Sequence, residues 1–460
     1  MAMKTFDIEP HVAGEVRIGS ARSENVVWAG RMSERGNKER IIFDGSENFV
    51  ALEVGKRGSG KSFGMGSILE AFATHNGSLI GTHTVPRAVL LLDPLDIHWT
   101  AIEPLRKDGS EGMRKQYELL SGWKELSPEP LNIQVFMPAG YSWEIDHPGF
   151  VPYQLPVSAL DASDWAFLLD CDLLTEPRGR LIDEVYRKVT ELGWQRGHGP
   201  VQPKSQYTIQ DFVDCAEHDE DISSFYHRET IRSVVQPLRS FERMPLFDSK
   251  GTPLTALLRE GTLSILCLGR LPSSIRTVLT TVIVRKLRSD RMYASQIRRR
   301  LTISQDTPDK RVELERALAQ CAPRTILAID EAQILLPQRE SSSIRKELDA
   351  FVLEGRNYGL SLWMATQRPK GAVSSAAASQ IDTFIVHRLS VQEDIDAVVG
   401  LLQNAVPAKI RHNGRPIELS EMIRQLEAGQ AIFSSAVSTA PRLVVGTIRP
   451  RVVAHGGEGF

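Results

Sequence analysis

Cysteine is scarce and scattered in this 460-residue chain. The four cysteines form no C-x-x-C pair, which argues against a zinc site and against a disulfide scaffold. A reducing cytoplasm is therefore the expected location. The sequence also lacks an apolar run of about 18 residues that could span a bilayer, and its first stretch, MAMKTFDIEPHVAGE, contains no apolar signal core. We expect a soluble protein without a membrane partner.

A strong net charge is also absent. The formal charge is −2, so any binding of nucleic acid must come from a local basic lining and not from an overall positive field. No internal repeat of about 20 to 50 residues is visible, which argues against a solenoid. Hydrophobic residues make up 42% and charged residues 24% of the chain, as in ordinary globular proteins. The length allows a large core with two or three substructures.

The stretch VGKRGSGKSFG follows a short apolar run and precedes a helical pattern. Gly55, Gly60, Lys61 and Ser62 satisfy the phosphate-binding pattern G-x-x-x-x-G-K-S in its required context of strand, loop and helix. Backbone N–H groups and the helix N-terminus attract phosphate, the lysine reaches the β- and γ-phosphates, and the serine hydroxyl holds Mg²⁺. The alternative is a glycine turn with a surface lysine.

A second apolar run, TILAIDEAQ, ends in two acids. Asp330 is expected to act on the Mg²⁺ shell, and Glu331 to polarise the water that attacks the γ-phosphate. Gln367, after LWMAT, could sense the γ-phosphate or orient that water, or it is a loop glutamine. Asp93, at the end of VLLLD, either joins the site or caps a turn at Pro94.

Hydrolysis of ATP is the chemistry that these residues favour. The catalytic candidates among these motifs are Lys61, Glu331 and Gln367. Ser62 and Asp330 are the Mg²⁺ candidates. The nucleotide-binding candidates are Gly55, Arg57, Gly58, Ser59, Gly60, Lys61, Ser62, Phe63 and Asp330.

Apolar runs and helical patterns alternate along the chain, which predicts an α/β fold with parallel crossovers. The predicted buried strands are 49–54, 88–93, 132–137, 262–268, 325–330, 360–366 and 382–389. Between about 160 and 257, charged residues with Leu and Phe at helical intervals predict a helical insertion. Residues before 48 predict short β-strands, and 302–314 predicts an exposed loop.

Several of these segments resemble one family when taken together. GKRGSGKS, AVLLLDP, ILAIDEAQ and above all EGRNYGLSLWMATQRP are similar to the HerA branch of the HerA/FtsK superfamily of hexameric, RecA-like ATPases that translocate DNA. Three later segments follow in the same order as in that family: GTLSILCLGRLP, DTFIVHRLSVQEDI and the tail PRLVVGTIRPRVVAHGG, which resembles the C-terminal brace of such proteins. The resemblance covers about residues 49 to 455, and the block 354–369 is its specific part.

The resemblance implies an organisation for the whole chain. It predicts a RecA-like P-loop ATPase core, mainly of parallel sheet, in a hexameric ring with DNA in its channel and a nuclease or other effector as partner. The expected units are an N-terminal β-rich segment (1–48), a first core part (49–159), the helical insertion (160–257), a second core part (258–440) and a C-terminal brace (441–460).

The resemblance also assigns a role to an arginine. The E-G-R-x-Y-G block places Arg356 where family members carry a finger that reaches the nucleotide of the neighbouring subunit. A fixed guanidinium there stabilises charge on the γ-phosphate; the alternative is an arginine favoured by a helix C-terminus. For Arg388, in FIVHRL, the two expectations are a role related to that of Arg356 or a surface salt bridge. Two departures are the short N-terminal segment, which leaves the partner open, and Leu268, where relatives often carry an acid.

The channel contacts and the use of ATP stay open. The richest basic stretch, VRKLRSDRMYASQIRRRL, is either a DNA contact or a solvated helix face. The leading hypothesis is a DNA-pumping ATPase in DNA end processing or in antiviral defence. The alternative is a ring scaffold that uses ATP as a conformational ligand to activate a partner. A small-molecule kinase fits poorly with Glu331 and Arg356, and no LSGGQ-like signature of transporters is present.

Overall fold

The structure is a computed structural model. It describes residues 14–20, 22–33, 39–75, 77–141, 147–197, 199–303, 306–336, 343–370, 374–402, 409–412, 415–435 and 442–457. All candidate site residues lie within these ranges. Parts of the predicted N-terminal β segment (1–13, 21 and 34–38) and of the predicted brace (441 and 458–460) lie outside the described residues.

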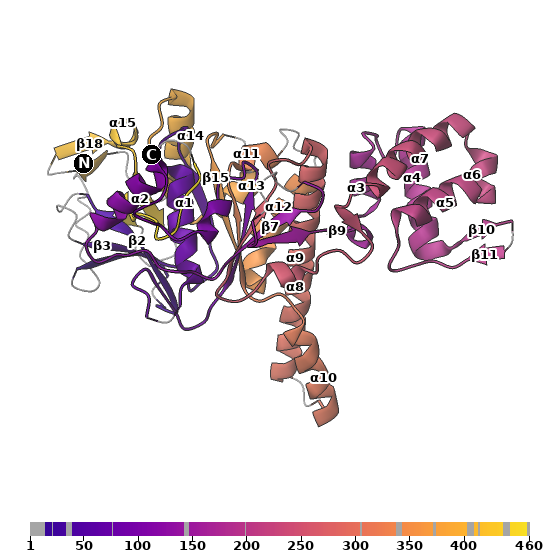
Figure 1. Ribbon diagram of the computed structural model, residues 1–460, viewed down its shortest axis with the longest axis horizontal. Helices are drawn as coiled ribbons and strands as arrows, with labels where there is room; N and C mark the ends of the chain where they lie inside the picture. Colours follow the sequence, from indigo (N-terminus) through magenta and orange to yellow (C-terminus); the bar gives the residue numbers. More distant parts are fainter. Residues whose placement is uncertain are drawn as a thin grey trace.

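One large sheet organises the molecule (Figure 1). Among the described residues it has fourteen strands, in the order β1-β3-β2-β20-β19-β16-β4-β15-β14-β6-β13-β7-β8, with β5 beside β2. The strands are β1 (Glu15–Gly19), β2 (Asn25–Met32), β3 (Arg40–Asp44), β4 (Val50–Val54), β5 (Gly81–His83), β6 (Ala88–Asp93), β7 (Ile133–Pro138), β8 (Phe150–Tyr153), β13 (Leu263–Cys267), β14 (Thr325–Ile329), β15 (Leu360–Thr366), β16 (Thr383–Val386), β19 (Gln430–Ser435) and β20 (Arg442–Ile448).

The strands from β16 to β8 run parallel to one another and form the centre of this sheet. Each predicted buried strand is found here, which confirms the α/β class and the parallel core. Strand β15 lies between β4 and β14, so the glycine loop and the Asp-Glu pair follow two strands that are separated by one strand. Since parallel strands end at one edge, the loops that carry these motifs meet there.

Antiparallel strands extend the sheet beyond β16. Strands β19 and β20 add in turn, and β2 pairs with β20 through Gly30↔Ile448. The strands of the N-terminal segment therefore belong to the same sheet as the core. The remaining strands are short pairs: β9 (Leu155–Pro156) with β12 (Phe247–Asp248), β10 (Trp194–Arg196) with β11 (Gly199–Val201), and β17 (Lys409–His412) with β18 (Arg415–Glu418).

Helices cover both faces of the sheet, and the alternation of each strand explains why. In β4, Val50, Leu52 and Val54 enter one core, and Ala51 enters the other. The helices are α1 (Lys61–Glu70), α2 (Glu111–Ser121), α3 (Ala162–Leu168), α4 (Pro177–Arg187), α5 (Ile209–His218), α6 (Glu220–Phe225), α7 (Arg228–Glu242), α8 (Leu254–Leu257), α9 (Ser273–Ile303), α10 (Pro308–Ala319), α11 (Ala332–Leu335), α12 (Ser343–Glu354), α13 (Ser375–Ala378), α14 (Gln392–Leu402) and α15 (Leu419–Gln425).

The helices α3 to α7 form a lobe at one end of the molecule, in the region predicted as a helical insertion (Figure 1). The short turns beside the helices are η1 (Ala71–Ala73), η2 (Trp99–Ile102), η3 (Val157–Ala159), η4 (Lys188–Leu192) and η5 (Gly355–Tyr358). None of the described helices combines the length and the apolar character that crossing a bilayer requires.

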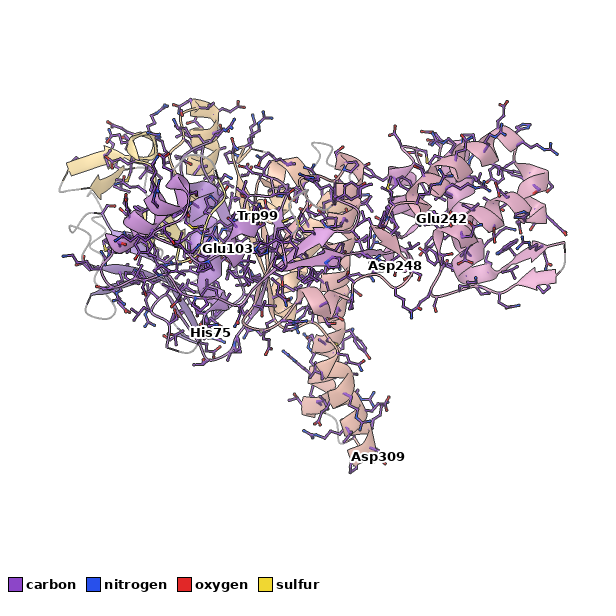
Figure 2. The ribbon with its side chains drawn as sticks, viewed as in Figure 1. His75, Trp99, Glu103, Glu242, Asp248 and Asp309 are labelled. Carbon is purple, nitrogen blue, oxygen red and sulfur yellow. The ribbon has the colours of Figure 1, made fainter. Side chains whose placement is uncertain are left out.

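The prediction of an exposed loop over 302–314 is wrong. Helix α9 continues to Ile303, and α10 begins at Pro308 and packs back against α9. Proline at the first helical position is favourable because its missing N–H has no partner there anyway. The polar composition that suggested a loop reflects a solvated helix pair, which projects from the body; Figure 2 labels Asp309 at its far end.

Candidate active site

The glycine loop between β4 and α1 has the backbone conformation that phosphate binding requires. Gly58 and Gly60 have positive φ values of 72° and 95°, which an L side chain rarely adopts. The Ser59 hydroxyl donates to the Lys56 carbonyl at 2.8 Å and holds the turn. The first N–H groups of α1 therefore point toward the space above the loop.

At position 55 a glycine is required because the backbone packs closely against two side chains and leaves no room for a Cβ atom. A Cβ atom here would lie 2.5 Å from the Ser59 Oγ and 2.8 Å from the His387 Cβ. His387 cannot give way easily, because it is fully buried and its Nε2 contacts the Glu53 Oε1 at 2.8 Å. Glu53 in turn accepts from the Trp363 Nε1 at 3.0 Å. This buried network underlies the loop.

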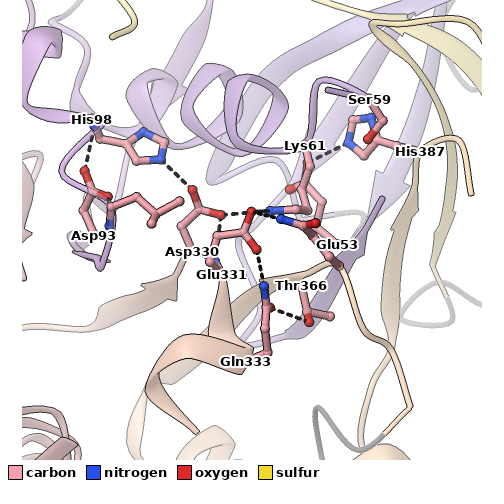
Figure 3. A network of polar contacts seen from close by, with 12 residues as sticks. Glu53, Ser59, Lys61, Asp93, His98, Asp330, Glu331, Gln333, Thr366 and His387 are labelled. Carbon is pink, nitrogen blue, oxygen red and sulfur yellow. Dashed lines mark hydrogen bonds and ion pairs between the residues drawn. The ribbon is translucent and has the colours of Figure 1, made fainter. Parts of the chain in front are cut away.

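Lys61 and the two acids after β14 come together at the carboxyl edge of the sheet (Figure 3). The Lys61 Nζ lies 3.2 Å from the Asp330 Oδ1 and 2.8 Å from the Glu331 Oε1. All three side chains are buried. Burial alone would lower the pKa of Lys61, but Asp330 and Glu331 raise it. Burial opposes ionisation of Asp330, yet Lys61 and His98 hold the pKa of that carboxyl well below its usual range.

Glu331 is surrounded by donors. Its Oε1 accepts from the Gln367 Nε2 at 2.8 Å, and its Oε2 from the Gln333 Nε2. Gln333 is fixed by the Thr366 hydroxyl, which donates to its Oε1 at 2.8 Å. The backbone of Glu331 is left-handed, with φ 44°, so the residue turns out of the strand direction at this point. Gln367 thus lies beside Glu331 at this edge of the sheet.

Asp93 caps a turn, which was one of its two predicted roles. Its Oδ1 accepts from the Leu95 N–H at 3.2 Å and its Oδ2 from the His98 N–H at 2.7 Å. Burial raises the pKa of this carboxyl. The turn brings His98 to the site, where its Nε2 contacts the Asp330 Oδ2 at 3.0 Å.

The residues that sequence reasoning missed are His98, Gln333, His387 and Glu53. None belongs to a spaced pattern within one segment. The only signal was position, because His98 and His387 follow the carboxyl ends of β6 and β16.

The donor set fits a magnesium ion that is shared with a nucleotide. Ser62 is the second residue of α1 and helps to lower the pKa of the Asp330 carboxyl, so two hard oxygen donors lie near each other. Within the part of the chain that the structure describes, no cluster of three or more His, Cys, Asp or Glu side chains could hold a metal alone. Mg²⁺ typically binds through one or two protein carboxylates together with substrate phosphates.

The other nucleotide-binding candidates differ in their exposure. Arg57 and Gly58 are exposed at the tip of the loop. Phe63 is buried, and its ring packs on that of His455 with centroids 5.6 Å apart. Because the ring is buried, the predicted nucleotide contact of Phe63 can come only from its backbone N–H. Arg388 touches the loop through its carbonyl, which accepts from the Lys56 N–H at 3.1 Å.

Arg356 is not brought to this site within one chain. It lies in η5 before β15, whereas the site follows the other end of that strand. Six residue steps of about 3.3 Å place it about 20 Å from its own glycine loop. Its guanidinium donates to the Asp382 carboxylate and the Gln380 carbonyl, and its side chain is 38% exposed.

Much of the basic stretch in α9 is used within the chain. Arg291 is buried and donates to the Tyr358 and Ala322 carbonyls, so it is not a DNA contact in this fold. Arg285 pairs with Asp161 and Asp164, and Arg288 with Glu347 and Glu354. Arg300 pairs with Asp306. The exposed basic residues that remain are Lys286, Arg298 and Arg299.

Comparison with known proteins agrees with this geometry. No protein-family model matches the chain. The DNA double-strand break repair helicase HerA of Pyrococcus furiosus is 24% identical over 223 residues, which are 47% of this chain. The match spans only 38% of that relative.

Solved structures extend the likeness to most of the chain. VirB4 of Thermoanaerobacter pseudethanolicus aligns with 94% of this chain and 98% of its own, at a TM-score of 0.51 and 13% identity, which shows a common fold. The bacterial conjugative coupling protein TrwBdeltaN70 aligns over 96% of this chain and 98% of its own, at 11% identity and a TM-score of 0.46, too low to add to the argument.

Three observations now point the same way: the parallel sheet with β15 between β4 and β14, the P-loop lysine against an Asp-Glu pair, and the sequence match to HerA. The chain has a RecA-like fold, and these findings support its resemblance to the HerA/FtsK superfamily of P-loop ATPases.

Proposed function

We propose that this protein is an ATP-hydrolysing DNA translocase motor of HerA type. It works as a hexameric ring with a nuclease or other effector, in DNA end processing or in antiviral defence. The observation that carries the proposal is the meeting of Lys61, Asp330, Glu331 and Gln367 at one sheet edge, with Arg356 at the opposite edge.

The site residues have distinct tasks in hydrolysis. The glycine loop and the N-terminus of α1 hold the phosphates, and Lys61 leaves the two acids to bind the β- and γ-phosphates. Ser62 and Asp330 would hold a Mg²⁺, which would supply positive charge beside the phosphates. Glu331 then accepts hydrogen bonds from the attacking water, while Gln367 orients that water.

The position of Arg356 supports an assembly of several copies. It is too far from its own nucleotide site to act there, yet it is partly exposed and held by only one carboxylate and one carbonyl. In a ring it would leave Asp382 and reach the γ-phosphate of the neighbouring subunit. A finger of this kind contributes on the order of 10³-fold or more to the rate.

DNA is the proposed track because a ring of such ATPases moves a polymer through its channel. Contact with the phosphate backbone needs exposed cations and no base recognition. Lys286, Arg298 and Arg299 are the exposed cations of the basic stretch of α9. The proposed grip is therefore independent of sequence and weakens as salt is raised.

ATP turnover with and without duplex DNA tests the proposal. The wild type should hydrolyse ATP, duplex DNA should stimulate it, and Lys61→Ala should abolish nucleotide binding or turnover. Displacement of a bound third strand would report movement along DNA. A ring that binds ATP and activates its partner without turnover would instead match the scaffold alternative. Mass spectrometry of copurifying proteins would identify the effector.

A further inference from the structure

The two carboxylate oxygens of Asp330 have different hydrogen-bond partners. Its Oδ1 accepts from the Lys61 Nζ at 3.2 Å and from the Glu331 N–H at 2.8 Å. Its Oδ2 lies 3.0 Å from the His98 Nε2 (Figure 3). Because Asp330 is fully buried, these contacts fix the rotation of the carboxylate about its Cβ–Cγ bond.

His98 is itself held in one orientation. Its side chain is 0% exposed, and its backbone N–H is bound by the Asp93 Oδ2 at 2.7 Å. Among the described residues, none offers a hydrogen bond to its Nδ1. Since an ionised carboxylate can only accept, the proton of the imidazole lies on Nε2 and is donated to Asp330.

The C-terminal tail supports the imidazole from behind. The His455 ring lies 5.6 Å from that of His98, between centroids, and the same distance from that of Phe63. The backbone of His455 is clamped by Gln116, which accepts from its N–H at 2.9 Å and donates to its carbonyl at 2.8 Å. Burial, with Arg451 beside it, lowers the pKa of His455 well below its usual range.

The tail is anchored to the helix that follows the glycine loop. The Arg451 Nε donates to the Glu70 Oε2 at 3.0 Å, and the Arg449 Nη1 to the Glu70 Oε1 at 3.0 Å. All three side chains are buried, so the pairing is protected from solvent. Helix α1, the tail and the loop that carries His98 thus form one packed unit behind Asp330.

We propose that His98 is a positioning residue that sets the orientation of Asp330 toward the Mg²⁺ of a bound nucleotide, and that His455 seats His98 for this task. The inference rests on the proposed nucleotide site and deepens it. Residues that orient a metal ligand in this way typically change metal affinity or activity by about 10- to 100-fold when they are removed.

Nucleotide binding separates this role from a general effect on folding. A fluorescent ADP analogue would be titrated against the full chain at a series of Mg²⁺ concentrations and also in EDTA. His98→Met removes the donor at similar volume, and His98→Gln keeps an N–H. His218→Met, at an exposed histidine of α5, is the matched control. Thermal unfolding would report whether each variant is folded.

The expected result is specific for the metal. His98→Met should raise the Mg²⁺ concentration for half-maximal binding at least about tenfold, while affinity in EDTA stays within about twofold. His98→Gln should recover most of the difference, His455→Ala should shift in the same direction by a smaller factor, and His218→Met should match the wild type. Unchanged Mg²⁺ dependence in His98→Met, or equal loss with and without Mg²⁺, would overturn the role of His98. An unchanged His455→Ala would overturn the role of the tail.

A spectroscopic measurement on the wild type keeps the inference testable if His98→Met does not fold. With ¹⁵N-labelled histidine, the Nε2–H resonance that disappears in His98→Gln should shift when Mg²⁺ with ADP is added, but not with ADP in EDTA. A resonance that Mg²⁺ with ADP leaves unmoved overturns the inference. A wild type that binds no nucleotide under any condition instead overturns the proposed function.

Discussion

At the scale of single residues, Glu331 shows how the site separates binding from hydrolysis. Its carboxylate accepts from Lys61, Gln333 and Gln367, and as the proposed base it would also accept from a water. In the proposed reaction, Lys61 leaves Glu331 to meet a phosphate, and Oε1 keeps the hydrogen bond from Gln367 while one of its acceptor positions opens. The same departure of Lys61 would then prepare Glu331 to accept from a water.

Glu331→Gln should retain ATP binding and lose hydrolysis. The amide is a far weaker base, and losing general base catalysis typically costs about 10²- to 10⁴-fold in rate. Equilibrium binding of a fluorescent ATP analogue and single-turnover hydrolysis would measure the two effects separately. Lys61→Ala is the comparison, since it should lose binding itself. Equal loss of nucleotide affinity in both variants would contradict these roles.

Gly55→Ala should weaken nucleotide binding through the loop backbone. The added Cβ would meet the Ser59 Oγ at 2.5 Å and the His387 Cβ at 2.8 Å, so the loop must shift away from a buried histidine. We expect at least about a tenfold loss of ATP affinity if the cost is about 1.4 kcal/mol or more. Gly112→Ala in α2, where a Cβ meets nothing within 4 Å, is the control. Equal affinity of the two variants would count against this packing argument.

The site could be predicted from the sequence wherever a motif lies within one segment. Lys61, Asp330, Glu331 and Gln367 were found because a strand end and a spaced pattern mark them. His98 and Gln333 were not, because their roles arise from contacts between segments more than 200 and about 30 residues apart in sequence. No local rule of spacing encodes such contacts.

At the scale of elements, the contact between the helical lobe and α9 includes ion pairs, one of them with a buried carboxylate. Arg285 of α9 binds Asp164 of α3 and Asp161 just before it. Burial raises the pKa of Asp164 to about 6, against the lowering effect of Arg285. The folded protein therefore keeps a proton on Asp164 between about pH 4 and 6, where the unfolded chain has released it.

This sign predicts a decrease in stability as the pH rises. The contribution of Asp164 to the free energy of unfolding is largest below about pH 4, falls between about pH 4 and 6, and is constant above. The fall is at most on the order of 3 kcal/mol, at about 1.4 kcal/mol for each pKa unit. Thermal midpoints of wild type minus Asp164→Asn should therefore decrease from pH 4 to 6.5. A difference that rises over this range would show that the ion pair with Arg285 outweighs burial.

The elements of the parallel core were predictable because each strand is a continuous apolar run covered on both faces. Leu360–Thr366 and Ala88–Asp93 match their predicted ranges residue for residue. The register in which β2 adds to β20 was not predictable, since the partners lie more than 400 residues apart. The extension of α9 was missed because a polar end on a long helix resembles a loop in composition.

At the scale of the whole molecule, the sheet separates two functions between its edges. The carboxyl edge carries the P-loop and the two acids, and the amino edge carries Arg356 against Asp382. The length of β15 separates the two edges, so Arg356 does not reach the nucleotide site of its own copy. In the proposed ring, a complete site would combine two copies, with the amino edge of one facing the carboxyl edge of the next.

Mixed rings test this arrangement directly. Lys61→Ala and Arg356→Ala are each expected to lose ATP turnover. For Arg356→Ala the expected loss is at least about 10³-fold. Yet a boundary between the two variants, with Lys61 from one and Arg356 from the other, contains every residue the site needs. With random mixing at equal amounts, about one boundary in four is complete, from one half multiplied by one half.

ATP turnover across mixing ratios should therefore rise from near zero to a maximum of about a quarter of the wild type at equal amounts, if the sites act independently. A mixture of two separate preparations of Lys61→Ala controls for subunit exchange and should stay inactive. If every mixture of the two variants stays as inactive as the separate variants, Arg356 does not act across a boundary. Full activity of Arg356→Ala alone would remove the arginine from the reaction, and its pairing with Asp382 would then be its whole role.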